Sequence, residues 1–202
     1  MVYVIGITGR ICSGKSTLLN VMNSRGIPTI DCDKIGWELY SKDSIAFSAY
    51  VKEFGKDVIG KDGNIDRKKL SACVFGHPEK VKRISEISWP MIYQVLVNKI
   101  EKFSCEGHKI VGVEAALLIK ANWECINEIW QTKIDDEITI NRLMKRNNLS
   151  REEASKRLNS QPSQEEYDKK ANVTFNTNCS LEQTAKEINK KLDETIKMVE
   201  AK

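Results

Sequence analysis

One short segment near the start of the chain constrains the fold more than any other feature. Residues 9–16, GRICSGKS, fit the pattern G-x-x-x-x-G-K-[ST]. A short β-branched run, residues 2–7, precedes the segment, and an apolar helical pattern follows it over residues 17–22. Because this motif needs a strand before it and a helix after it, the sequence predicts a P-loop, which cradles phosphate oxygens.

The residue types of the loop indicate how it would bind a nucleotide. Gly9 and Gly14 let the backbone approach a polyphosphate closely, and the loop N–H groups converge on the phosphate oxygens. We expect Lys15 to reach the β- and γ-phosphates, the Ser16 hydroxyl to hold Mg²⁺, and Thr17 to contact the α-phosphate. The predicted nucleotide ligands in this segment are Gly9, Arg10, Ile11, Cys12, Ser13, Gly14, Lys15, Ser16 and Thr17.

Length, charge and cysteine pattern narrow the class of ligand. A chain of 202 residues is long enough for one α/β domain with an insertion or a small lid. Its net charge of +4 suits an anionic small molecule and is too weak to indicate nucleic acid or a membrane surface. The six scattered cysteines, without any C-x-x-C pair or secretion signal, predict a reducing compartment and a cytoplasmic location.

Short apolar runs alternate with helical patterns along the chain. Strands are predicted at residues 2–7, 26–30, 110–113, 128–132 and 173–175. Helices are predicted at 17–22, from near Asp33 to 40, at 44–54 and 67–75, from Pro78 to about 105 with a break or kink at Trp89-Pro90, at 137–147 and 151–160, and from about Ser180. This alternation implies a mostly parallel sheet with helices on both faces, and the helical stretch 34–107 is predicted to be a subdomain.

Two carboxylates follow the second predicted strand. Asp31 and Asp33 would lie at the carboxyl edge of the sheet, which is the edge that also carries the loop and binds ligands in parallel sheets. A kinase needs a carboxylate there to accept the proton of an acceptor hydroxyl or to orient it, and we predict this role for Asp33. Asp33 could also serve as a helix N-cap. For Asp31, a Mg²⁺ ligand and a structural role are both open.

A pair of basic helices is predicted over residues 137–161. Arg142 and Arg146 are four residues apart, so they share one helix face, and Ser150 with Glu153 forms a capping-box pattern. A mobile, arginine-bearing lid would stabilise charge on a transferred phosphoryl group and keep water out. An ordinary solvated pair of charged helices is the alternative.

Together these features resemble the dephospho-CoA kinase family over nearly the whole chain. The matching segments are residues 5–17, Ile30-Asp31-Cys32-Asp33, 63–70 with Val74-Phe75, and 142–161. Two further segments, Ser88-Trp89-Pro90 and residues 114–118, look most like the kinase domain of the animal bifunctional CoA synthase. A P-loop alone is shared by many families, whereas this loop with this Asp-x-Asp and this basic segment is specific.

The resemblance implies a fold like that of the nucleoside-monophosphate kinases, with a core (1–33, 108–136 and 171–202), an acceptor-binding helical subdomain (34–107) and a lid (137–161). It implies transfer of the ATP γ-phosphoryl group to the ribose 3′-hydroxyl of 3′-dephospho-CoA, with Mg²⁺. Asp33, Lys15 and Arg142 would be catalytic, and Arg142, Arg146 and Arg157 would contact phosphates or adenine. The candidate metal ligands are Ser16, Asp31 and Glu114. The sequence predicts no oligomeric state.

Four positions depart from the pattern of the family. Trp89 stands where most bacterial members have His, Glu114 replaces an Asp, Ala116 replaces a Pro and Lys120 replaces a Glu. Glu114 keeps the negative charge with a longer reach. We expect these changes to affect the fit of the acceptor more than the phosphoryl chemistry.

Two other functions are compatible with a P-loop. A kinase for a nucleoside or a nucleoside monophosphate could use this fold and lid, but the long helical insert disfavours it. A nucleotide-binding switch of the GTPase class needs a guanine-reading motif such as N-K-x-D, and Asn189-Lys190 is followed by Lys191-Leu192. A catalytically silent scaffold would be expected to lose Lys15 or Asp33, and both are present.

Overall fold

The computed structural model describes residues 2–115 and 118–201, which fall into two compact units. The sheet unit comprises Met1–Ile30 and Ile100–Lys202, and the helical unit comprises Asp31–Lys99. The predicted acceptor-binding subdomain, residues 34–107, overlaps most of the helical unit. Within the described residues, no helix combines the length and the apolar character needed to cross a membrane.

The sheet contains the five strands that the sequence predicts. They are β1 (Tyr3–Thr8), β2 (Thr29–Asp31), β3 (Ile110–Glu114), β4 (Glu128–Lys133) and β5 (Val173–Asn176). Their order is β2-β3-β1-β4-β5, and β1 pairs in parallel with both β3 and β4. Because the chain leaves β1 toward β2 on one side and later crosses to β4 on the other, the carboxyl end of β1 is a topological switch point, where such sheets bind ligands.

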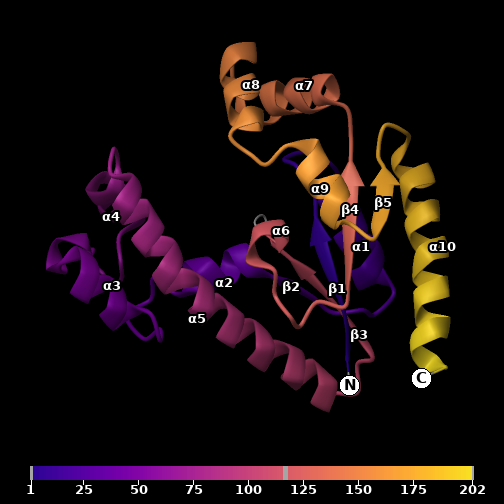
Figure 1. Ribbon diagram of the computed structural model, residues 1–202, viewed down its shortest axis with the longest axis horizontal. Coiled ribbons are helices and arrows are strands. Elements are labelled where there is room, and N and C mark those ends of the chain that lie inside the picture. Colours follow the sequence, from indigo (N-terminus) through magenta and orange to yellow (C-terminus); the bar gives the residue numbers. More distant parts are fainter. Residues whose placement is uncertain (1, 116–117, 202) are drawn as a thin grey trace. The chain divides into compact units, whose positions relative to one another are not determined.

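Helices cover both faces of the sheet, as predicted (Figure 1). On one face α1 (Lys15–Ser24) and α10 (Leu181–Glu200) bury Leu18, Met22 and Ile188 against Ile7 and Trp130. On the other face lie α6 (Leu118–Ala121) and α9 (Gln164–Lys170). Leu118 approaches β1 so closely there that a Cβ atom on Gly6 would lie 2.6 Å from its Cδ2 atom.

Two helices form a hairpin beyond the carboxyl end of β4 (Figure 1). They are α7 (Asp136–Asn147) and α8 (Arg151–Asn159), which we call the α7–α8 hairpin. Its own small core consists of Ile140, Leu143, Ala154 and Leu158. The predicted capping box is confirmed, since Ser150 and Glu153 exchange both hydrogen bonds at the start of α8.

The helical unit is built from α2 (Cys32–Glu38), α3 (Phe47–Phe54), a 3₁₀ turn η1 (Lys56–Val58), α4 (Arg67–Val74) and most of α5 (Pro78–Cys105). Tyr50 is fully buried in its core, and the Tyr50 hydroxyl shares a 2.7 Å hydrogen bond with Ser88. The sequence predicts a break or a kink at Trp89-Pro90, and the break is wrong, because α5 is one helix that contains Pro90. Proline there removes one backbone hydrogen bond, and packing of neighbouring α5 residues such as Met91 and Ile92 into the core offsets that loss.

Candidate active site

The loop between β1 and α1 has the backbone conformation that only glycine accommodates at its two ends. Gly9 has φ 142° and Gly14, the N-cap of α1, has φ 99°. A Cβ atom on Gly9 would lie 2.5 Å from the Thr132 carbonyl oxygen, so a side chain there would displace β4. Cys12 also has a positive φ, 59°, which is uncommon for a residue with a side chain.

Two buried threonines hold the loop against the sheet. Ser13 and Thr132 share a 2.7 Å hydrogen bond between their hydroxyl groups. Thr177 donates a 2.7 Å hydrogen bond to the Ser13 carbonyl oxygen and is itself buried after β5. Neither threonine is among the site residues predicted from the sequence, although their place at the ends of β4 and β5 is a signal that could have identified them.

Lys15 lies across the loop that it follows. Its Nζ atom donates hydrogen bonds to the carbonyl oxygens of Gly9, at 2.9 Å, and Arg10, at 3.2 Å. Ser16 is exposed in the first turn of α1, beside the positive end of the helix. An ammonium group and a helix N-terminus thus meet at one point, which suits a polyphosphate.

Arg10 and Ile11 are directed toward the hairpin. The Arg10 guanidinium donates to Asp136 Oδ1 at 2.7 Å and to the Leu158 carbonyl oxygen at 3.1 Å. The Ile11 amide N–H donates to Gln161 Oε1 at 2.7 Å. These two predicted nucleotide ligands therefore connect the loop to the hairpin through the Arg10 side chain and the Ile11 backbone.

A cavity of about 300 Å³ lies between the loop, the hairpin and the segment after β5. Arg142 and Arg146 both line it, as their shared helix face predicts, and Arg142 donates a 3.0 Å hydrogen bond to the Cys12 carbonyl oxygen. The remaining lining residues are Cys12, Gly14, Ser16, Thr17, Thr177, Cys179, Leu181 and Thr184.

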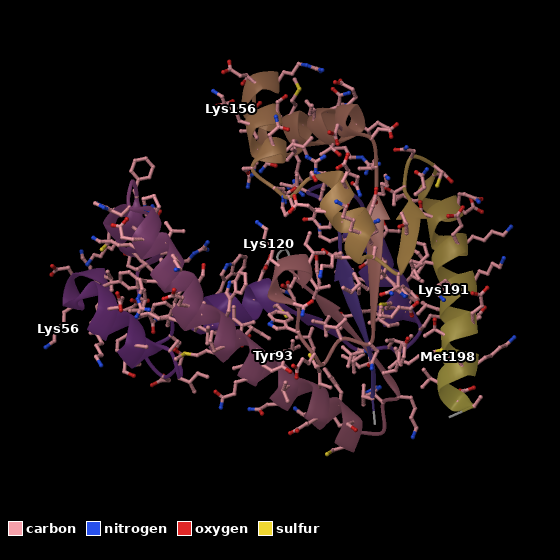
Figure 2. The ribbon with its side chains drawn as sticks, in the orientation of Figure 1. Lys56, Tyr93, Lys120, Lys156, Lys191 and Met198 are labelled. Atoms are coloured by element: carbon pink, nitrogen blue, oxygen red, sulfur yellow. The ribbon has the colours of Figure 1, made fainter. Side chains whose placement is uncertain are left out.

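The other basic side chains of the hairpin lie on its exposed surface. Arg157 is exposed on α8, and the Lys156 side chain extends from the same helix into solvent, where it pairs with Glu152 at 2.7 Å (Figure 2). Arg151 donates to both carboxylate oxygens of Glu137. One side of the hairpin therefore presents charged side chains to solvent, and the other side carries Arg142 and Arg146 facing the loop.

An ion pair between Lys133 and Asp168 holds the carboxyl end of β4, beside the loop. Asp168 of α9 accepts hydrogen bonds from Lys133 Nζ at 2.8 Å and from Gln131 Nε2 at 2.7 Å. The Lys133 hydrogen bond holds the pKa of the Asp168 carboxyl below its usual range. Asp168 therefore stays ionised and fixes the side chains at the end of β4.

Asp31, and not Asp33, is the N-cap of α2. Asp31 Oδ1 accepts hydrogen bonds from the backbone N–H groups of Asp33, at 3.0 Å, and Lys34, at 3.2 Å. The expectation that Asp33 could be the cap is wrong, because the helix begins at Cys32 and Asp33 lies inside its first turn. The exposed Asp33 carboxylate thus has no capping role.

Glu114 and Ser16 lie at the loop edge of the sheet unit. Glu114 ends β3 and pairs in register with Ile7, two residues before Gly9. Within residues 2–115 and 118–201, no group of three or more His, Cys, Asp or Glu side chains could by itself hold a metal ion. Any cation here would therefore take most of its ligands from a bound phosphate and from water.

The helical unit has its own cavity, of about 890 Å³. It is lined by Arg67, Lys68, Ser71, Ala72 and Phe75 along one side of α4. The Phe75 side chain is 83% exposed at its rim, and the Arg67 guanidinium lies 5.1 Å from the ring centre of Trp37. Positive charge and exposed aromatic surface are thus combined around one opening.

The four departures from the family pattern have different environments. Trp89 is half-buried on α5, and Lys120 extends from α6 into solvent (Figure 2). Glu114 is half-buried at the end of β3, and Ala116 lies outside the described residues.

Comparison with known proteins places these features in context. A family model described as dephospho-CoA kinase matches residues 3–183. A dephospho-CoA kinase from Dehalococcoides mccartyi is 36% identical over 180 residues, covering 89% of this chain and 90% of the relative.

Solved structures agree in fold. TT1252 from Thermus thermophilus has a TM-score of 0.78 at 30% identity and covers 96% of this chain and 97% of its own. A dephospho-CoA kinase from Campylobacter jejuni has a TM-score of 0.64 at 27% identity, covering 95% of this chain and 96% of its own. The predicted α/β kinase fold, a parallel sheet flanked by helices, is therefore confirmed.

Proposed function

This chain belongs to the dephospho-CoA kinase family, and from that premise we propose how its residues divide the reaction. The enzyme transfers the γ-phosphoryl group of ATP to the ribose 3′-hydroxyl of 3′-dephospho-CoA, which gives CoA and ADP. The observation that carries this conclusion is the family match over residues 3–183. The phosphate loop lies inside that match with both of its glycines and Lys15 in place.

The loop is the proposed site of the ATP phosphates. Its N–H groups and the N-terminus of α1 supply fixed partial positive charge, which needs no reorganisation during the reaction. Lys15, now bonded to two loop carbonyls, would exchange these for the β- and γ-phosphate oxygens. Most of the stabilisation would thus come from positioned charge, as is usual for phosphoryl transfer.

The cavity beside the loop is the proposed site of the rest of the nucleotide. Its wall combines two guanidinium groups, Arg142 and Arg146, with the apolar side chain of Leu181, which is 73% exposed. Guanidinium planes stack on aromatic rings. Contact with an aromatic ring would also remove the exposed leucine side chain from water, which is favourable, so the adenine ring suits this wall. The α7–α8 hairpin would then act as the lid, with Arg142 close enough to the loop to meet a phosphate. We assign the exposed Arg157 a contact only if the hairpin rearranges.

Asp33 is the proposed general base. Its carboxylate is exposed in the first turn of α2, where Asp31 and not Asp33 caps the helix. A base must present an accessible oxygen to the acceptor hydroxyl, and Asp33 does so.

The cavity along α4 is the proposed acceptor site. Arg67 and Lys68 offer two positive charges to the diphosphate of 3′-dephospho-CoA, while Phe75 and Trp37 offer apolar surface to its uncharged parts. Its volume of about 890 Å³ lies within the range for sites that bind small molecules.

The oxygen donors of the loop edge fit Mg²⁺. This ion typically takes one or two protein ligands and completes its shell with phosphates and water, which matches a Ser16 hydroxyl and a single carboxylate, Glu114. When bound, Mg²⁺ neutralises charge on the transferred phosphoryl group. One carboxylate oxygen of Asp31 accepts hydrogen bonds from two backbone N–H groups at the start of α2, so we assign Asp31 the structural role. The cysteine pattern supports a cytoplasmic enzyme.

The test is ADP release from Mg²⁺-ATP, with and without 3′-dephospho-CoA, by the natural protein and by Lys15→Ala. We expect ADP only when the acceptor is present, and a loss of at least about 10²-fold in kcat for the variant. An acceptor panel that includes AMP discriminates the competing kinase. Faster turnover of AMP than of 3′-dephospho-CoA would replace this proposal by a nucleotide kinase.

A further inference from the structure

Arg10 occupies an unusual position for a charged residue in a phosphate loop. The residue is only 8% exposed, and its guanidinium is buried among the loop, α7, α8 and α9. Asp136 and Leu158, the two groups that accept its hydrogen bonds, stand at the start of α7 and near the end of α8. One side chain therefore holds both ends of the hairpin to the loop.

Other contacts join the same two segments. The Ile11 N–H donates to Gln161, which follows α8, and Arg142 of α7 donates to the Cys12 carbonyl oxygen. Ile11 and Cys12 also pack against the small apolar core of the hairpin. Three consecutive loop residues are thus attached to the hairpin, while the loop is attached to the sheet through Ser13.

Stability alone does not explain a buried guanidinium here. Desolvation of a charge is costly, and an apolar side chain of similar volume often stabilises such a position equally well. The Arg10 Nε atom and the Tyr167 hydroxyl are both buried, and neither has a hydrogen-bond partner among the described residues. An apolar residue would leave no such unpaired group on its own side chain, but it could not hold two helix ends in register with the loop.

We propose that Arg10 is a positioning residue that sets the hairpin over the phosphate loop and thereby places Arg142 against the bound nucleotide. This inference rests on the proposed nucleotide-binding roles of the loop and of Arg142. The planar guanidinium fork matters as much as its charge, because its two terminal nitrogens reach acceptors on two different helices. Arg10 itself need not touch ATP.

The experiment is a double-mutant cycle between Arg10 and Arg142, read by direct ATP binding and by steady-state kinetics. Arg10→Met keeps the apolar stem and removes the charge, and Arg142→Ala removes the group that Arg10 positions. In the natural background we expect Arg10→Met to raise the Kd for ATP on the order of 10-fold and to lower kcat as well. In the Arg142→Ala background we expect the same change to have an effect within about 2-fold, because its target is already absent.

Three further variants define the interpretation. Arg10→Lys keeps the charge but offers one ammonium to two separated acceptors, so we expect only part of the affinity to return. Asp136→Asn weakens one arm at an exposed partner, because the amide oxygen still accepts a hydrogen bond but carries no charge. It should fold and weaken ATP binding about 3-fold even if Arg10→Met is unstable. Arg25→Met breaks a comparable pair with Asp193 in the same unit and should leave the Kd unchanged.

Two outcomes would overturn the inference. The first is an equal loss from Arg10→Met in both Arg142 backgrounds, which would make Arg10 an independent structural residue. The second is an unchanged Kd in both Arg10→Met and Asp136→Asn. Failure of the proposed function is distinguishable, because the binding cycle needs no acceptor and can be measured even if 3′-dephospho-CoA is not phosphorylated.

Discussion

The sheet unit and the helical unit prepare their ligand sites in different ways. In the sheet unit the loop main chain forms the site, and buried side chains such as Ser13, Thr132 and Thr177 hold it in place. In the helical unit the candidate site is a wall of α4 side chains with Phe75 exposed beside it. The proposed phosphate site is therefore held in place by the folded sheet unit, whereas the proposed acceptor site leaves the apolar side chain of Phe75 exposed.

The largest expected effect separates catalysis from nucleotide binding. Asp33→Asn removes the proposed base from the helical unit and keeps nearly the same shape, so we expect kcat to fall about 10²- to 10⁴-fold. The Kd for ATP should stay within about 2-fold, since Asp33 is proposed to act on the acceptor hydroxyl and not to bind a phosphate. Rapid-quench or steady-state ADP release measures the first quantity and calorimetry the second. An unchanged kcat in the folded variant would remove Asp33 from the mechanism.

The second effect concerns the stability of the helical unit at high pH. Burial raises the pKa of the Tyr50 hydroxyl to about 12, against about 10 when the chain is unfolded. Between these values the unfolded chain binds fewer protons than the folded chain, so stability falls as the pH rises from about 10 to about 12, by roughly 2 to 3 kcal/mol.

Tyr50→Phe tests this origin directly. The variant lacks the ionisable hydroxyl, so its melting temperature should decline less between pH 9 and pH 11 than that of the natural protein. At neutral pH the variant should be less stable by about 1 kcal/mol, because the hydrogen bond to Ser88 is lost. Identical declines in both proteins would assign the alkaline transition to other groups.

A smaller effect tests whether the α4 cavity binds the acceptor. Arg67→Met removes a charge from its wall, and we expect the KM for 3′-dephospho-CoA to rise about 10-fold with little change in the KM for ATP. Lys52→Met is the matched control, because Lys52 is an exposed lysine of α3 that does not line the cavity. If the two variants have the same KM for the acceptor, Arg67 is not part of its site.

The smallest effect compares two buried tyrosines, one in each unit. The Tyr167 hydroxyl is buried without a hydrogen-bond partner in the described part of the chain, in contrast to that of Tyr50. Removing it in Tyr167→Phe should change the free energy of unfolding by less than about 0.5 kcal/mol or raise it slightly. Urea denaturation of the two variants at pH 7 gives the comparison, and a loss from Tyr167→Phe as large as that from Tyr50→Phe would indicate a bound water.

Local signals predicted most of the elements correctly. The five strands follow from short apolar runs, and the Ser150 capping box follows from a hydroxyl three residues before a glutamate. Both signals lie within a few consecutive residues. The same signature at Ser163 and Glu166 marks α9, which is not among the helices predicted from the sequence. The break expected at Pro90 did not occur, because packing outweighs one missing hydrogen bond.

The sequence by itself determined the loop between its strand and its helix, since a strand, two glycines, a lysine and a helix start are contiguous and need no distant partner. Only the tertiary structure decided what supports the loop. Thr132, Thr177 and Asp136 come from segments more than a hundred residues away. They meet the loop because β4 pairs with β1, and β5 pairs with β4 on the same side of the sheet. The burial of Arg10 follows from that strand order, because a residue pattern records which side chains are charged but not which distant helices will close around them.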